Sequence, residues 1–311
     1  MNKTSFSLLA VVLGAALPGA LPLQAQQPPA APAQADSTEV TVDENVSYAV
    51  VNGTQLRLDV YKPSGHDANR PAVVLIHGGG WSMLDKSTMG RMGKFLARSG
   101  FVAFSVDYRL FHDAENRWPA QLDDVQRAVR WIRANAAKYG VNPDRIGAFG
   151  HSAGAQLAAL LGMEETRDNS DPVLAKYSSR VQAVVDVSGP SDFTSEHDSE
   201  SVAFLTSFLG ADRVKHPEVW REASPAFHVA KENAPFLIVH GTQDPDVPIA
   251  QAEELFEKLQ SAGVSASLVK VNDVHTFQTT EARLQLAFET VTFFNHYLVV
   301  TPKLSSNPTV K

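Results

Sequence analysis

Residues 150–154 read Gly-His-Ser-Ala-Gly, which fits the G-x-S-x-G pattern around a nucleophilic serine. An apolar, strand-like run, Ile146 to Phe149, comes before the pattern, and a helix-like run, Ala155 to Leu161, follows it. This sharp change from strand to helix would place Ser152 on a strained turn, with its hydroxyl at the carboxyl end of a sheet. Side chains at Gly150 or Gly154 would collide with a neighbouring strand or helix. The pentapeptide alone is also compatible with a simple glycine turn, so other parts of the chain must decide.

A second candidate element is the run of three glycines in His77-Gly-Gly-Gly-Trp81, which follows the apolar run Ala72 to Ile76. Glycines leave backbone N–H groups uncovered, as an oxyanion hole requires. We expect Gly79 and Gly80 to donate hydrogen bonds to a developing oxyanion, with the N–H of Ala153 as a third donor. The alternatives are a flexible loop or a phosphate nest, and no Gly-Lys-Ser/Thr follows to favour the nest. We expect His77 to tie the loop together.

Candidates for an acid and a base follow two later apolar runs. Asp244 and Asp246 come after Phe236 to Val239, and His275 comes after Ser267 to Val271. A histidine there can take and return the serine proton if a carboxylate orients it. Asp244 is the preferred carboxylate and Asp246 the reserve, although either aspartate could simply form a turn. Asp273 is a further competitor. The chain order Ser, Asp, His favours His275 over the other nine histidines.

The elements needed to position these residues are an alternation of strands and helices. Asn52-Gly53 between two alternating runs predicts an antiparallel hairpin, and the later apolar runs predict buried strands. The expected fold is a mostly parallel sheet of about eight strands, with an N-terminal antiparallel hairpin, helices on both faces and small cap insertions. The expected strands are 46–51, 55–61, 72–76, 101–106, 146–149, 181–187, 236–239 and 267–271. The expected helices are 89–98, 119–139, 155–161, 249–261 and 283–297, and the expected insertions are 164–179 and 192–223.

The ends of the chain have their own composition. Residues 1–25 have a positive start, an apolar centre and small residues before Ala25, which predicts a secretory signal peptide. Residues 26–40 are rich in Pro, Ala and Gln and predict a disordered leader, 41–302 one catalytic domain, and 303–311 a flexible tail. We therefore expect a periplasmic or secreted protein without a stable membrane anchor.

Composition narrows the function further. The formal charge of -7 argues against nucleic acid as a partner, and the lack of cysteine excludes a thiol nucleophile, an Fe–S site and a lipidated anchor. No set of residues has metal-ligand spacing, and no G-x-G-x-x-G follows the first parallel strand. We expect a small-molecule substrate and no cofactor or metal. The oligomeric state stays open.

Taken together, the motifs resemble the α/β-hydrolase superfamily, in particular bacterial esterases related to hormone-sensitive lipase and to the feruloyl-esterase-like BD-FAE family. They cover most of residues 50–280 in the family's order. The matching stretches are 77–81 (HGGGW), 106–110 (VDYRL), 118–125 (WPAQLDDV), 131–140 (WIRANAAKYG), 142–146 (NPDRI), 150–154 (GHSAG) and 240–244 (HGTQD).

The resemblance implies a serine carboxylesterase with Ser152 as nucleophile, His275 as base, Asp244 as its orienting partner, and Gly79, Gly80 and Ala153 in the oxyanion hole. It also implies structural roles for residues 107–109 and 123–124. The sequence departs from the lipase branch at 111–113, where Phe-His-Asp replaces the usual Ala-Pro-Glu, which weakens a lipase-type substrate assignment.

Trp81 and Trp118 are candidate substrate-binding residues, and the aromatic residues of 192–223 could wall a small pocket. Together they favour esters of short acyl, acetyl or aromatic groups, including sugar esters. Three alternatives stay open: a peptidase of the prolyl-oligopeptidase type, a small-amide hydrolase, and a non-catalytic binding protein on the same fold.

Overall fold

The computed structural model describes residues 39–65, 68–195 and 198–300, and the predicted signal peptide and tail lie outside this range. A single eight-stranded sheet runs through the described residues, in the order β1-β2-β4-β3-β5-β6-β7-β8. The strands are β1 (Val40–Val51), β2 (Thr54–Pro63), β3 (Arg70–Ile76), β4 (Val102–Val106), β5 (Val141–His151), β6 (Ala183–Val187), β7 (Phe236–Gly241) and β8 (Ala266–Val271). Strand β2 pairs antiparallel with β1 and β4, and the remaining pairs are parallel.

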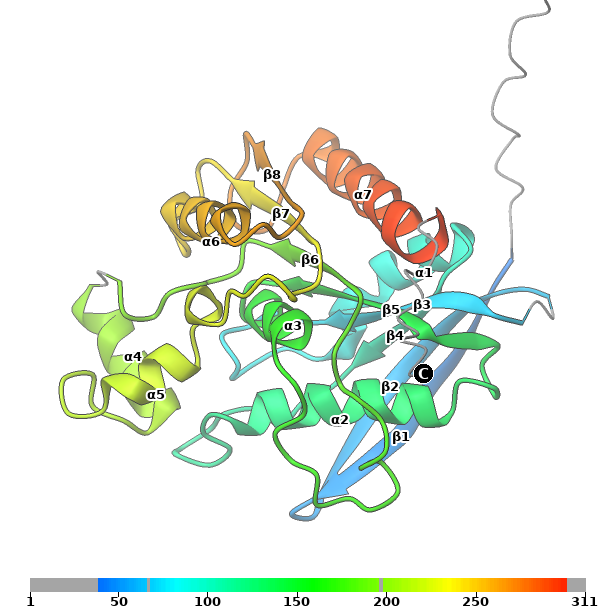
Figure 1. The fold of residues 1–311 in the computed structure, drawn as a ribbon, viewed down its shortest axis with the longest axis horizontal. Helices are drawn as coiled ribbons and strands as arrows, with labels where there is room; N and C mark the ends of the chain where they lie inside the picture. Colours follow the sequence, from blue (N-terminus) through cyan, green and yellow to red (C-terminus); the bar gives the residue numbers. More distant parts are fainter. Residues whose placement is uncertain (1–38, 66–67, 196–197, 301–311) are drawn as a thin grey trace, which may run out of the picture. The chain divides into compact units, whose positions relative to one another are not determined.

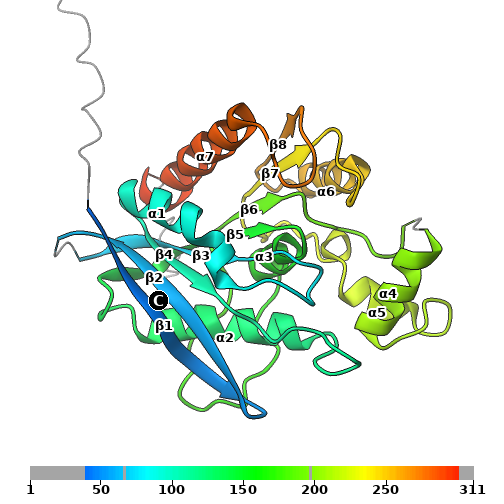
Figure 2. The same cartoon turned by 180° about the vertical axis from the view of Figure 1, so that it is seen from behind.

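Helices cover both faces of this sheet (Figure 1, and from behind in Figure 2). The α-helices are α1 (Gly90–Arg98), α2 (Ala120–Ala134), α3 (Ala153–Met163), α4 (Ser199–Leu209), α5 (Pro217–Glu222), α6 (Ile249–Ser261) and α7 (Thr280–Phe294). Short 3-10 turns, η1 (Lys86–Met89) and η2 (Pro225–Phe227), and a π-helical turn, η3 (Asn295–Val300), complete the set. None of the helices in the described residues is long and apolar enough to cross a membrane.

Successive side chains of a strand point to opposite faces of the sheet, so the core is divided into two clusters, one on each face. In β3, Val74 and Ile76 belong to the cluster that packs under α2, α3 and α6, whereas Val73 and Leu75 belong to the cluster under α1 and α7. All four side chains are fully buried. This two-sided burial is why the central strands are continuous apolar runs, as the sequence predicts.

The predicted fold class is confirmed, including the hairpin at Asn52-Gly53, where Val51 pairs with Thr54. The boundaries differ in places. The α2 helix ends at Ala134 instead of 139, because the chain turns at Asn135 into the start of β5. The α7 helix begins earlier than expected, because the Thr279 hydroxyl caps the N–H of Ala282. Strand β1 starts at Val40, one residue before the predicted domain boundary.

The two expected insertions behave differently. The described residues of 192–223 include α4 and α5, which lie beyond the carboxyl ends of the strands (Figure 1). The other segment, 164–179, packs along α2 instead: Arg130 donates to the carbonyl oxygens of Asp168 and Leu174, and Arg127 pairs with Asp168 at 2.8 Å. Only the first insertion therefore caps the sheet edge where the candidate residues gather.

Candidate active site

Ser152 occupies the turn between β5 and α3 with φ 56° and ψ −123°, a strained conformation for a residue with a side chain. The flanking glycines make this turn possible. A Cβ on Gly150 would lie 2.1 Å from the carbonyl oxygen of Gly154, and a Cβ on Gly154 would lie 2.2 Å from that of Ile76. The predicted collisions at both positions are thus confirmed. The turn holds Ser152 at the carboxyl edge of the sheet, where its N–H donates to Val187.

The three-glycine loop passes close to this serine. A Cβ on Gly78 would lie 2.9 Å from the carbonyl oxygen of His151 and 3.1 Å from Cβ of Ser152, so a larger residue would require the backbone to shift. Gly79 and Gly80 both have positive φ, 100° and 55°. They line one cavity together with Ser152 and with Ala153, the first residue of α3. The free N–H groups and positive dipole at the start of that helix favour negative charge here.

His77 anchors the loop, as expected. Its buried ring stacks on Tyr108 with centroids 4.3 Å apart, and the Tyr108 hydroxyl donates to the carbonyl oxygen of His77 at 3.0 Å. Burial lowers the pKa of His77. The imidazole is therefore held neutral inside the loop, away from the cavity that contains Ser152.

His275 lines the same cavity as Ser152, and its partner is Asp244. The distance from Nδ1 of His275 to Oδ2 of Asp244 is 2.7 Å. The other carboxylate oxygen, Oδ1, accepts the backbone N–H groups of Asp246 and Val247, both at 2.9 Å. This leaves Nε2 of His275 as the ring nitrogen for proton exchange on the cavity side.

Asp244 has a second histidine neighbour. Nε2 of His240 lies 3.3 Å from Oδ2 of Asp244 and 2.8 Å from the carbonyl oxygen of Val247. Burial alone would raise the pKa of Asp244, but hydrogen bonds from His240 and His275 outweigh it and hold that pKa well below its ordinary value. The carboxylate is thus ionised and able to stabilise an imidazolium on His275.

The two competing aspartates take other roles. Asp246 is exposed and gives only its backbone N–H to Asp244. The Asp273 carboxylate accepts the Thr279 hydroxyl at 2.6 Å and the backbone N–H groups of residues 274, 278 and 279. It braces the loop that carries His275 and does not contact the ring. Of the three carboxylates considered in the sequence, only that of Asp244 is hydrogen-bonded to His275.

Asp244, Asp246 and His275 also offer three possible metal-ligand atoms within 4.8 Å of one another. Both carboxylate oxygens of Asp244 already have hydrogen-bond partners. The partner of Oδ2 is Nδ1 of His275. A cation bound through Nδ1 of His275 would require that hydrogen bond to be given up. The donors therefore suit proton transfer better than a metal.

The two tryptophans have different positions. Trp81 lines the cavity, where its ring stacks on Phe208 with centroids 4.6 Å apart and its Nε1 donates to Gln156 at 3.1 Å. Trp118 does not line the cavity: it is buried at the side of Phe208, with ring centroids 6.4 Å apart. The backbone N–H of Trp118 also donates to the carbonyl oxygen of Phe208 in α4 at 3.1 Å, so Trp118 is a packing residue of the cap and the prediction that it binds substrate is not supported.

The cap supplies several side chains that the sequence did not single out. Helix α4 contributes Glu200, Ser201 and Leu205. Phe193 and Phe204, which the sequence predicted as pocket walls, also line the cavity. Two other aromatic residues proposed as pocket walls, Phe208 and Trp220, are fully buried beneath. For all these cap residues, the only signal in the sequence was their position in the insertion 192–223. Which face of α4 lines the cavity depends on how the cap packs against the edge of the sheet.

Gln156 is a further residue that the sequence missed. It is fully buried in α3, where Oε1 accepts Nε1–H of Trp81 and Nε2 donates to the carbonyl oxygen of Ala223 at 2.7 Å. One side chain thus ties the glycine loop and the end of α5 to the helix that follows Ser152.

The charged residues expected to be structural form a buried clamp next to the site. Arg109 binds Asp124 with two hydrogen bonds, at 2.7 and 2.9 Å, and donates to the carbonyl oxygen of Ala120. The carboxylate of Asp107 accepts the N–H of Lys86. Both interactions tie loops at the sheet edge to neighbouring helices, in agreement with the predicted role.

Comparison with known proteins identifies the family of the chain. The family model BD-FAE matches residues 58–259. The chain is 34% identical over 204 residues to Esterase LipC of Mycobacterium tuberculosis, covering 63% of this chain and 49% of LipC. The chain spans about half the length of the first curated relatives it matches.

Two solved structures are also similar. A truncated carbohydrate esterase from gut microbiota is 29% identical with a TM-score of 0.72, covering 86% of this chain and 98% of that one. A propionate-bound esterase of Thermogutta terrifontis is 25% identical with a TM-score of 0.72, at the same coverage. With its fold, its glycine loop and its serine turn in the family's order, the chain belongs to the BD-FAE family of α/β-hydrolases.

Proposed function

We propose that the protein hydrolyses carboxylic esters through a Ser152-His275-Asp244 triad. One observation carries the proposal: Ser152, on its strained turn, shares a cavity with His275, whose Nδ1 lies 2.7 Å from the buried carboxylate of Asp244. Glycine backbone and the start of α3 line the same cavity. This combination supplies a nucleophile, a base and an oxyanion site in one place.

The mechanism follows from these positions. Nε2 of His275 takes the proton of Ser152 as its Oγ attacks the ester carbonyl carbon. The oxyanion accepts N–H groups of Gly79, Gly80 and Ala153, a type of stabilisation in which one donor contributes about 3 kcal/mol. The tetrahedral intermediate collapses, the alcohol leaves with the proton from His275, and the acyl group stays on Ser152. Water then repeats the sequence and releases the carboxylic acid.

The proposed substrates are esters with a short acyl, acetyl or aromatic group, sugar esters among them. The cavity has a volume of about 720 Å³, within the range of small-molecule sites. Trp81, Phe193 and Phe204 form an aromatic wall, with the Trp81 and Phe193 rings edge to face at 5.5 Å. Aromatic walls suit flat acyl groups and the apolar faces of sugars. The similar carbohydrate esterase and propionate-bound esterase support this choice.

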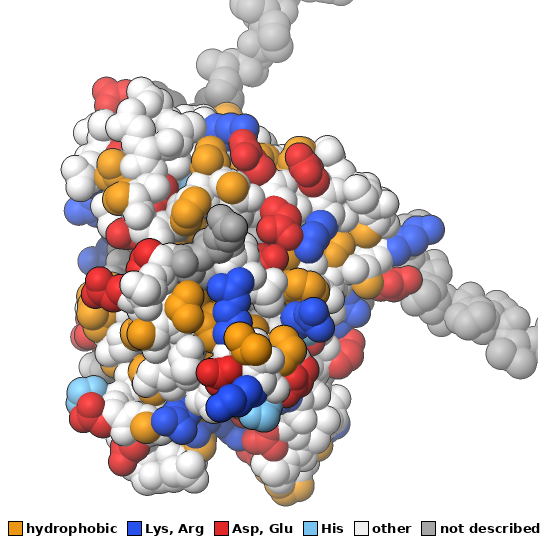
Figure 3. All heavy atoms as spheres, turned by 90° about the vertical axis from the view of Figure 1, so that its left-hand side faces the viewer, with side chains coloured by type: hydrophobic (Ala, Val, Ile, Leu, Met, Phe, Trp, Pro, Cys, Tyr) orange, Lys and Arg blue, Asp and Glu red, His pale blue; other side chains and the backbone are white. Residues whose placement is uncertain are grey.

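The surface around the cap fits a small substrate. Figure 3 shows the side of the molecule that carries α4, α5 and α6, where acidic, basic and hydrophobic side chains are interspersed. A nucleic-acid site would require a basic patch or stripe. On the described residues of that face, no large patch of a single charge forms, so a small ester remains the proposed partner.

The test is hydrolysis of p-nitrophenyl esters from acetyl to palmitoyl by the purified mature protein, beside a Ser152→Ala variant. We expect activity to peak at short chains and to fall roughly 10⁶-fold in the variant. An aminoacyl-anilide tests the peptidase and amidase alternatives, and a fluorophosphonate tests for the non-catalytic alternative. If the wild-type protein cleaves no ester and does not react with the fluorophosphonate, the proposal is wrong.

We also propose that the protein is exported, from the signal-peptide pattern in residues 1–25. The test is expression of the full chain in a Gram-negative host, followed by N-terminal sequencing of the periplasmic and cytoplasmic fractions. Processing near Ala25 in the periplasm supports export. An unprocessed chain confined to the cytoplasm contradicts it.

A further inference from the structure

A second cavity lies between α1 and α7, on the face of the sheet opposite α3. Its volume is about 780 Å³, and its walls are mostly apolar. Six of the apolar side chains come from both helices, from β5 and from the loop after His275: Met92, Phe95, Phe149, Phe277, Leu284 and Leu286. The mechanism proposed above uses none of them. Both size and lining match those of small-molecule sites.

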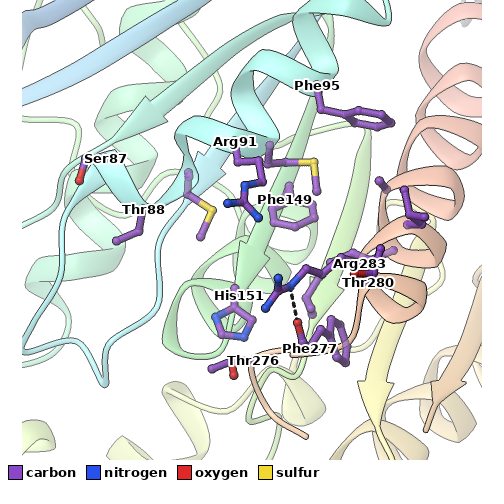
Figure 4. Close-up of a pocket in the computed structure, with 16 residues that line it drawn as sticks. Ser87, Thr88, Arg91, Phe95, Phe149, His151, Thr276, Phe277, Thr280 and Arg283 are labelled. Carbon is purple, nitrogen blue, oxygen red and sulfur yellow. Dashed lines mark hydrogen bonds between the residues drawn. The ribbon is translucent and has the colours of Figure 1, made fainter. Parts of the chain in front are cut away.

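Two cations enter this apolar space from opposite sides. Figure 4 shows Arg91 reaching from α1 and Arg283 from α7 towards the same part of the cavity, near His151. Nε of Arg283 donates to the carbonyl oxygen of Phe277 at 2.7 Å, which fixes the direction of the side chain. Among the described residues this bond uses Nε of Arg283, and its terminal Nη groups have no acceptor, so they can bind a ligand.

No acidic residue balances these charges. The residues that line the cavity include no aspartate or glutamate. Within the described parts of the chain, neither Arg91 nor Arg283 forms a salt bridge, and Arg91 has no hydrogen-bond partner. Two unpaired guanidinium groups beside apolar walls are complementary to a molecule with one anionic end and one apolar end.

The cavity is separate from the one that contains Ser152 but shares part of its wall. His151 and Thr276 line both. Nε2 of His151 lies 2.9 Å from the carbonyl oxygen of His275, so the His151 ring forms part of the partition between them. A ligand among Arg91, Arg283 and Phe95 would therefore lie behind the catalytic residues and would not reach Ser152.

We propose that the α1–α7 cavity is a binding site for an apolar monocarboxylate, such as a medium-chain fatty acid. The carboxylate binds between the guanidinium groups of Arg91 and Arg283, and the chain packs against Phe95, Phe149 and Phe277. The charged end determines orientation, and burial of the chain supplies the apolar part of the affinity. Binding requires neither Ser152 nor ester hydrolysis, so this proposal and the esterase proposal can fail separately.

The test is calorimetric titration of decanoate, below its micelle-forming concentration, into the mature protein carrying Ser152→Ala. Decanol and acetate are titrated in parallel, since decanol keeps the apolar chain without the carboxylate and acetate keeps the carboxylate without the chain. We expect one decanoate per chain, and at least roughly tenfold weaker binding of the other two. Equal affinity for decanol and decanoate would overturn the proposal, because the arginines would then contribute nothing.

Variants locate the site. Arg91→Gln and Arg283→Gln together should weaken decanoate binding roughly tenfold or more. Arg98→Gln, an exposed arginine of α1 outside the cavity lining, is the matched control and should leave binding unchanged. A double variant that binds decanoate as tightly as its parent contradicts the proposal.

A steric pair separates the two cavities. Ala287→Trp fills the α1–α7 cavity, and Leu205→Trp narrows the cavity beside Ser152. We expect the first to abolish decanoate binding and the second to preserve it. The reverse pattern would place the fatty acid in the catalytic cavity and refute the assignment. Thermal unfolding checks that each variant folds. If Ala287→Trp does not fold, the variants of the two exposed arginines, Arg91 and Arg283, test the location of the site instead.

Discussion

Replacing Gln156 with methionine should destabilise the protein by about 2–6 kcal/mol. The side chain is fully buried, and its amide makes one hydrogen bond to the indole of Trp81 and one to the carbonyl of Ala223. Methionine has a similar shape, so the change adds little cavity volume. It leaves a buried N–H and a buried C=O without partners, at about 1–3 kcal/mol each. The expected fall in Tm is roughly 5–20 °C for a domain of this size.

The same substitution should also lower activity, because Trp81 lines the cavity beside Ser152. Loss of its tether to α3 allows the ring and the adjoining glycine loop to shift, and a displacement of about 1 Å at a reacting centre can cost on the order of 100-fold. We expect kcat/KM for p-nitrophenyl acetate, measured well below Tm, to fall roughly 10- to 100-fold.

Gln126 provides a matched control. It is also a buried helical glutamine with two bonds: its amide donates to the carbonyl of Glu165 at 3.1 Å and accepts the N–H of Arg167 at 2.8 Å. None of these residues lines the catalytic cavity. Gln126→Met should therefore keep its activity and lose less stability than Gln156→Met, because Glu165 and Arg167 are exposed and water can replace the lost hydrogen bonds.

The measurements are urea unfolding, followed by tryptophan fluorescence, and steady-state kinetics on the parent and both variants. The reasoning is refuted if Gln156→Met unfolds within about 0.5 kcal/mol of the parent, because buried polar groups without partners should cost more. It is equally refuted if Gln126→Met loses as much activity as Gln156→Met, since the loss of activity would then not depend on the tether of Trp81.

Three other predictions concern the site and its support. Asp244→Asn should lower kcat about 10⁴-fold on p-nitrophenyl acetate, whereas Asp246→Asn should change it little, because only Asp244 contacts the ring of the proposed base; equal losses would contradict the assignment. Gly154→Ala should abolish soluble, active protein, since the new Cβ would lie 2.2 Å from a backbone oxygen. Its control is Gly263→Ala, where a Cβ meets nothing within 4 Å and the only strain is that of a φ of 78°. This control should lower the free energy of unfolding in urea by about 1 kcal/mol. Burial raises the pKa of Asp186 to about 6. Because the folded state then binds the proton more tightly than the unfolded state, the contribution of Asp186 to stability is lost as pH rises from about 4 to 6. Asp186→Asn should therefore gain about 2–3 kcal/mol relative to wild type over that interval, and a constant difference in urea unfolding would refute this.

Local patterns predicted most of the fold. Apolar runs of four to seven residues, separated by helical periods, are sufficient because strands buried on both faces must be apolar throughout. The ends of helices were less predictable. The early start of α7 depends on a cap by Thr279, whose hydroxyl is also held by Asp273 from the preceding loop. The end of α2 at Ala134 depends on where the chain must turn to enter β5.

The candidate site was partly predictable for the same reason. Ser152 and the glycine loop are set by short contiguous patterns, since a strained turn and uncovered N–H groups need particular residues at particular spacings. The choice among carboxylates was less certain in the sequence. Asp244 faces His275, and Asp273 instead accepts the hydroxyl of Thr279. Thirty-one positions separate Asp244 from His275, so only the packing of two loops at the sheet edge brings them together.

The sequence by itself determined the class of fold, the strand-to-helix turn at Ser152 and the glycine loop at Gly79, because these depend on residues that are neighbours in the chain. The tertiary structure decided which aromatic residues reach the cavity and which support it: Trp81 lines it, and Trp118 packs beside Phe208. It also placed Arg91 and Arg283 in one cavity, from helices almost two hundred residues apart. Such contacts follow from the docking of whole elements, where burial of apolar surface and not local spacing determines which side chains meet.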